Sequence, residues 1–184
     1  MPLKLLVKGK LGFDYQKEEF VEVPDQTVVL EHCLLAVARW ESKWKKSFFK
    51  SFEKAAPAEV RSYISCMPMN EVDENFVVGL SNSQMQEITN YIAEEQTATT
   101  VTYHNRPASN NEILTSELLY YYMAQVPLPF DICERWHLSR LLKTLEIAAV
   151  KNDPDSRKKM PSHKWADQQR ALNELRLKQF KTKG

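Results

Sequence analysis

A thiol and an imidazole lie four residues apart at Cys133 and His137, a spacing that brings two side chains to one face of a helix. Such a pair could supply half of a metal site or a Cys–His nucleophile. His32 and Cys33 are adjacent and could add further ligands. The apolar neighbours of these residues, and the lack of a second Cys–His spacing, favour buried structural side chains instead. We therefore expect no metal and no catalytic residue, and we interpret Cys33, Cys66 and Cys133 as free thiols.

The motifs of common enzyme classes are missing from the sequence. It has no glycine-rich phosphate loop, no G-x-S-x-G, no H-E-x-x-H and no C-x-x-C, and only 4 of its residues are glycine. Tyr120, Tyr121 and Tyr122 could form a stacking platform for nucleic acid bases. Consecutive helical residues point about 100° apart, however, so these rings are expected in the core and at an interface. We expect neither a cofactor nor enzymatic activity.

The hydrophobic pattern predicts a mainly α (α+β) fold, a helical domain that begins with a small β-hairpin. Short strands at 3–8 and 18–23 are expected to form this hairpin, with a loop between them. Apolar residues then recur at three- and four-residue spacing, which predicts a helix from 27 to about 46. This helix carries Trp40 and Trp44, which we expect to act as packing anchors.

The rest of the chain is predicted to be largely helical. Glu41 and Lys45 are expected to form an i,i+4 ion pair on the exposed face of the first helix. Trp136 is a third expected packing anchor. Further helices are expected at 57–67, 81–95, 113–126 and 131–152. A capping box of Ser109 with Glu112 precedes the helix at 113–126. The β-branched residues at 97–103 predict a strand.

The net charge of +1 conceals two oppositely charged segments. Residues 1–150 carry 15 basic and 20 acidic side chains, whereas residues 151–184 carry 10 basic and 4 acidic side chains. This distribution divides the chain into a helical body, 1–150, and a basic segment, 151–184. Within the basic segment, a linker at 151–162 precedes a helix expected at 163–180.

A basic, sparsely apolar helix on a linker is suited to dock on a partner protein. A solvated tail and a nucleic acid contact through phosphates are the alternatives. The acidic body and the lack of a recognised DNA-binding pattern argue against nucleic acid. The residues expected to face a partner are Trp165, Arg170, Leu172, Leu175, Arg176 and Phe180.

The composition is typical of a globular protein, with 43% apolar and 27% charged residues. Its length favours one domain with an appended segment. No run of about 18 apolar residues is present, so we expect no membrane span. The N-terminus lacks the pattern of a signal peptide, which places the expected site of action in a cytoplasm or in something assembled there.

Seven stretches of the sequence are distinctive when they are taken together. They are LEHCLL (30–35), RWESKWKK (39–46), YISCM (63–67), TATT (97–100), TSELLYY (115–121), WHLSRLL (136–142) and RALNE (170–174). In this order they resemble a family of small proteins encoded among the virion structural genes of tailed bacteriophages. The resemblance covers about residues 30–180 and is nearest to tail-assembly chaperones.

The resemblance implies a role in assembly and no enzymatic activity. Proteins of this kind bind the tape-measure protein and recruit tail-tube subunits, so these are the expected partners, with homo-oligomerisation left open. The expected location is the host cytoplasm during assembly. The alternative is a structural subunit of the virion, such as a head–tail connector, a baseplate protein or a capsid-associated protein.

Overall fold

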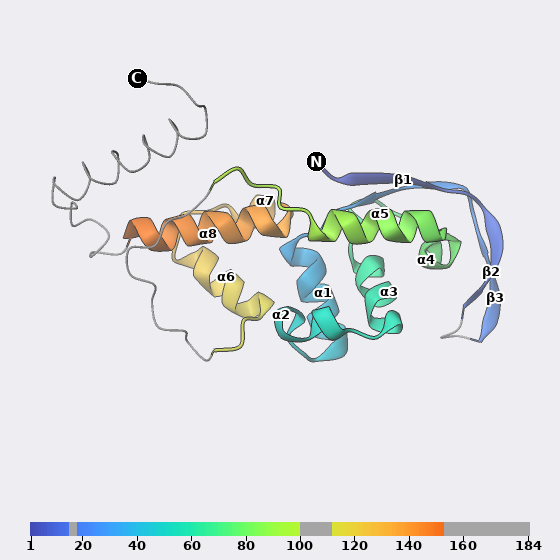
Figure 1. Cartoon of the computed structure of the whole chain (residues 1–184), viewed down its shortest axis with the longest axis horizontal. Helices are drawn as coiled ribbons and strands as arrows, with labels where there is room; N and C mark the ends of the chain where they lie inside the picture. Colours follow the sequence, from blue (N-terminus) through green and yellow to red (C-terminus); the bar gives the residue numbers. More distant parts are fainter. Residues whose placement is uncertain (15–17, 100–111, 153–184) are drawn as a thin grey trace, which may run out of the picture.

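The computed structural model describes residues 1–14, 18–99 and 112–152. Its fold is mainly helical with a small antiparallel β element at the N-terminus, which confirms the fold class predicted from the sequence. Figure 1 shows a bent β-ribbon that runs along one side of the helices and curves around one end of them. The segment 153–184, with its six expected partner-facing residues, lies outside the described residues.

The β element is one long hairpin with a break in the middle. Its strands are β1 (Leu3–Val7), β2 (Lys10–Asp14), β3 (Glu19–Val23) and β4 (Gln26–Leu30). β1 pairs antiparallel with β4, and β2 pairs antiparallel with β3. The two ladders share one register, since Val7 faces Gln26 and the next pair, after two unpaired residues on each strand, is Lys10 with Val23. We call the whole hairpin the β-ribbon.

The break in the β-ribbon coincides with Pro24, which has no N–H group to contribute to a ladder. On the opposite strand, the N–H group of Gly9 donates a hydrogen bond to the Asp25 carboxylate. A Cβ atom on Gly9 would lie 3.1 Å from both the Asp25 nitrogen and the Val23 oxygen, so glycine permits this close approach. The ribbon bends here in Figure 1, which carries β2 and β3 around the end of the helices.

Two sequence predictions about this region are wrong. The strand at 3–8 pairs with residues 26–30 rather than with 18–23, and the helix expected from residue 27 begins only at Leu34. Val28 and Leu30 are buried and alternate with the less buried Thr27 and Val29, which is the pattern of a strand with one buried face. The short apolar run from Val28 to Leu30 is compatible with a helix or a strand, and it forms a strand because it pairs with β1.

The helices follow the β-ribbon. They are α1 (Leu34–Trp44), α2 (Phe48–Ser51), α3 (Pro57–Cys66), α4 (Phe76–Gly79), α5 (Asn82–Ala93), α6 (Ser116–Ala124), α7 (Phe130–Cys133) and α8 (Leu138–Asn152), with a 3-10 turn η1 at Phe52–Lys54. α1 packs on α3 on one side and on α6 on the other. Among the described residues, no helix is both long enough and apolar enough to cross a membrane.

Capping side chains set the starts of α5 and α6. The Ser81 hydroxyl accepts from the Gln84 N–H at 3.2 Å, and the Gln84 side-chain oxygen accepts from the Ser81 N–H at 3.0 Å. This capping box fits the predicted start of α5. The Thr115 hydroxyl accepts from the N–H group of Leu118 and caps α6. The helix expected from 113 therefore begins three residues later, while Ser109 lies outside the described residues.

The single helix expected at 131–152 is interrupted between α7 and α8. The backbone between these helices forms hydrogen bonds with the link between β4 and α1 instead. The Leu138 N–H donates to the backbone carbonyl of His32 at 2.6 Å, and the Leu35 N–H donates to the backbone carbonyl of Glu134 at 3.2 Å. Cys33 and His137 also form an isolated antiparallel bridge. These tertiary hydrogen bonds replace helical ones, so Cys133 and His137 do not share a helix face.

Trp40 lies at the centre of the core and is fully buried. Its indole N–H donates to the backbone carbonyl oxygen of Glu59 at 3.0 Å, and that of Trp44 donates to the Ser62 hydroxyl at 3.0 Å. Trp44 and Trp136 are partly buried and pack against the core, and Arg140 lies over the Trp136 ring at 4.9 Å. Of the strand expected at 97–103, residues 97–99 are not in a strand, and the others lie outside the described residues.

Candidate functional site

A row of buried polar side chains crosses the link between β4 and α1. Glu31 and His32 are both buried and follow β4 directly. The Tyr91 hydroxyl donates to a Glu31 carboxylate oxygen at 2.6 Å, and the Tyr63 hydroxyl lies 2.5 Å from Nδ1 of His32. The row thereby joins the end of the β-ribbon to α3 and α5.

His137 completes this row from the break before α8. Its ring lies 5.2 Å from that of His32, centre to centre, with the planes 72° apart. Its Nδ1 lies 2.9 Å from the Ser139 hydroxyl, and its Nε2 lies 3.4 Å from the backbone carbonyl oxygen of Tyr91. Burial, followed by the charge of His137, lowers the pKa of His32 to about 3, so that imidazole is neutral at pH 7.

The chemistry of this row favours a structural role over catalysis. Burial raises the pKa values of Tyr63 and Tyr91, which keeps both phenols protonated as hydrogen-bond donors. Burial also raises the pKa of Cys33 to about 11 and that of Cys133 above its usual value. Thiols that stay protonated are poor nucleophiles. In the part of the chain that the structure describes, no group of three or more His, Cys, Asp or Glu side chains could hold a metal ion.

Glu41 is a second buried acid, so the prediction that it lies on the exposed face of the first helix is wrong. It is 6% exposed. One carboxylate oxygen accepts from the Phe48 N–H at 2.7 Å, and the other accepts from the Ser116 N–H and hydroxyl at 2.7 and 2.5 Å. The expected partner, Lys45, instead ends α1 in the left-handed conformation, with φ 54°. Glu41 therefore ties α1 to α2 and α6.

The three consecutive tyrosines of α6 serve separate contacts. The Tyr120 hydroxyl donates to Glu134 at 2.9 Å, the Tyr122 hydroxyl donates to Glu112 at 3.2 Å, and Tyr121 is exposed. They do not form one stacking platform, in line with the sequence analysis.

Large apolar side chains are exposed in two regions. On the β-ribbon, Leu11 is 68% exposed and Phe20 is 72% exposed. On α6 and α7, Tyr121, Phe130 and Ile132 are exposed as well. Side chains of this kind are typical of surfaces that contact other proteins.

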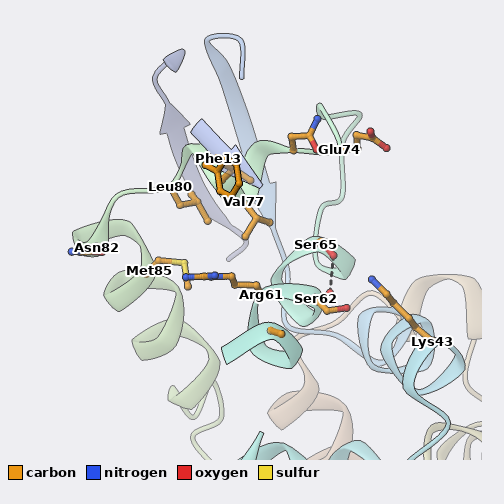
Figure 2. Close-up of a pocket in the computed structure, with 13 residues that line it drawn as sticks. Phe13, Lys43, Arg61, Ser62, Ser65, Glu74, Val77, Leu80, Asn82 and Met85 are labelled. Atoms are coloured by element: carbon orange, nitrogen blue, oxygen red, sulfur yellow. Dashed lines mark hydrogen bonds between the residues drawn. The ribbon is translucent and has the colours of Figure 1, made fainter. Parts of the chain in front are cut away.

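A pocket of about 490 Å³ opens beside the outer half of the β-ribbon. Figure 2 shows residues from the ribbon and α4 along one side of it, and residues from α3, α5 and α1 around the other. Its charged lining residues are Lys43, Arg61 and Glu74. Its apolar lining residues are Phe13, Ala58, Val77, Val78, Leu80 and Met85, and its uncharged polar ones are Ser62, Ser65, Asn75 and Asn82.

No pattern in the sequence indicates this pocket. Its residues come from five separate elements and form no short motif. The residues that were expected to face a partner, from Trp165 to Phe180, lie outside the described residues.

Comparisons with protein-family models, with curated proteins and with solved structures each found no match to this chain.

Proposed function

We propose that this protein is a bacteriophage tail-assembly chaperone that acts through protein–protein contacts with the tape-measure and tail-tube proteins. The proposal starts from the resemblance of seven stretches between residues 30 and 174 to the proteins of phage structural genes. On this proposal the protein works in the host cytoplasm while tails are assembled.

The observation that carries the proposal is the apolar surface that the folded body exposes. Leu11 and Phe20 are side chains of a type that folding usually buries, yet both are more than two-thirds exposed on a two-stranded ribbon. Exposed apolar side chains on an ordered scaffold favour a role in binding another protein. The buried polar groups described above are engaged within the fold, which supports the same conclusion.

The basic segment is the second element of the proposal. Its net positive charge contrasts with the acidic body, and its apolar residues recur at helical spacing, including Trp165, Leu172 and Phe180. We propose that this face docks in a groove of the tape-measure protein, while the body recruits tube subunits.

Co-expression with the tape-measure and tube proteins of the same phage tests the proposal. The chain is expected to co-purify with the tape-measure protein and to be absent or scarce in purified virions analysed by mass spectrometry. Stoichiometric presence in virions would instead support the alternative, a structural subunit such as a connector, baseplate or capsid-associated protein. Failure to co-purify with either protein would contradict the chaperone function.

A further inference from the structure

We propose that the pocket beside the β-ribbon binds an acidic peptide segment that carries a large apolar side chain. The inference rests on the proposed function, because it names the chemistry of the partner that this face of the body would recognise. Three features of the pocket carry it: its charge, its apolar wall and its open shape.

The charge of the lining favours an anionic occupant. Lys43 of α1 and Arg61 of α3 both line the pocket, and both are exposed. Neither forms an ion pair with an acidic side chain in the described part of the chain. Among the described lining residues Glu74 is the only acidic one, so the cations outnumber the anions there. A carboxylate of a partner would supply a counter-charge to Lys43 and Arg61.

The apolar wall favours a large side chain next to that carboxylate. Phe13 of β2, Val78 of α4 and Met85 of α5 line the same pocket. In Figure 2 the Arg61 side chain extends in the direction of Met85, and both residues line the same pocket. Methionine adapts its shape to different apolar partners. An aliphatic or aromatic residue flanked by acidic residues therefore satisfies both parts of the lining.

The shape favours a peptide over a small molecule. A volume of about 490 Å³ is within the range of ligand pockets. Several lining residues are nevertheless exposed, namely Lys43, Ala58, Arg61, Ser65, Glu74 and Asn82, so the site is an open cleft. Small-molecule sites bury most of the ligand surface, whereas an extended chain can lie across a cleft and insert one side chain.

The same charge argument disfavours the chain's own basic segment as the occupant. Residues 151–184 carry 10 basic and 4 acidic side chains, and Lys43 and Arg61 would repel the net positive charge of this segment. The pocket and the basic segment are thus suited to partners of opposite charge.

Selection from a library of random peptides displayed on filamentous phage tests the inference with the purified full-length chain. The enriched peptides are expected to combine Asp or Glu with Leu, Ile, Phe or Trp. Synthetic fluorescein-labelled copies of them should bind about tenfold or more weakly to the double variant Lys43→Glu, Arg61→Glu. Ser65→Trp, which places a bulky ring on the lining, should weaken binding without changing any charge.

The matched control is Lys50→Glu, Arg135→Glu. It alters net charge by the same amount at exposed cations that do not line the pocket, and it should leave peptide binding within about twofold of the unsubstituted chain. Urea unfolding of each variant shows whether its fold is retained.

The inference is overturned if no peptide is enriched, if the enriched peptides lack acidic residues, or if they bind the Lys43→Glu, Arg61→Glu variant as tightly as the control. The inference is also overturned if a single-stranded oligonucleotide competes as well as the unlabelled peptide does, because the apolar wall would then contribute nothing to binding. The experiment contains neither the tape-measure protein nor the tail-tube protein. A chain that selects acidic peptides but does not co-purify with the tape-measure protein would therefore contradict only the proposed function.

Discussion

Glu41 illustrates how one buried carboxylate can organise several helices. Its two oxygens accept three hydrogen bonds, from the Phe48 N–H group and from the N–H and hydroxyl groups of Ser116. Ser116 is 75 positions away along the chain. The sequence offers Glu41 a nearer partner at Lys45, and nothing local indicates that the acid is buried. The contact depends on tertiary packing, which is why spacing alone could not predict it.

Replacing this carboxylate should destabilise the fold. In Glu41→Gln one oxygen becomes an NH2 donor that faces donor groups, so buried hydrogen bonds are lost at a cost of about 2–4 kcal/mol. The free energy of unfolding in urea measures the effect. Glu53→Gln, at an exposed position, is the control and should change stability by less than about 0.5 kcal/mol. An equal effect of the two substitutions would contradict the structural role of Glu41.

His32 should make the fold acid-sensitive. Its pKa is lowered from 6.5 to about 3 in the folded chain, so between these values the unfolded chain binds more protons at this residue. Stability therefore falls as the pH falls from about 6.5 toward 3, by about 2 kcal/mol between pH 7 and pH 5 from this group. His32→Gln removes this contribution. Urea unfolding at both pH values should show a smaller loss in the variant, and an identical loss would rule out His32 as the cause.

At the scale of elements, capping and periodicity predict helices where local signals are clear. The Ser81 capping box fits the start of α5, and Pro57 marks the start of α3. The predictions of elements are wrong where contacts with residues distant in sequence determine the local structure. β4 is a strand because it pairs with β1, and the break between α7 and α8 forms because its backbone bonds to that of His32. The pocket is missed for the same reason, since its wall forms only when the β-ribbon bends onto α4.

The contact of the β-ribbon with α4 depends on Gly12. A Cβ atom at this position would lie 2.4 Å from Cγ1 of Val78, too close for the two to coexist without a shift. Gly12→Ala should therefore destabilise the fold by about 1–3 kcal/mol in urea unfolding. Val78→Ala removes the obstructing methyl groups, so the double variant should be more stable than Gly12→Ala alone. If the losses of stability of the two single variants simply add in the double variant, this account of the contact is contradicted.

At the scale of the whole molecule, the buried hydrophobic residues of the described part all belong to the helical body, 1–150. The buried hydrophobic residues of the described part run from Leu5 to Leu141, and α8 ends at Asn152. Stability and partner binding are therefore expected to separate along the chain, with the fold maintained by the body and the tape-measure contact made by the basic segment.

Truncation after Asn152 should separate the two properties. The shortened chain should unfold in urea within about 1 kcal/mol of the full chain, because no described core contact is removed. It should no longer co-purify with the tape-measure protein. In the full chain, Leu172→Glu with Phe180→Glu should abolish the same interaction, whereas Lys178→Glu, which changes net charge equally on the other face of the expected helix, should retain it. Undiminished binding by the shortened chain would assign the tape-measure contact to the body, where Leu11 and Phe20 are the exposed candidates.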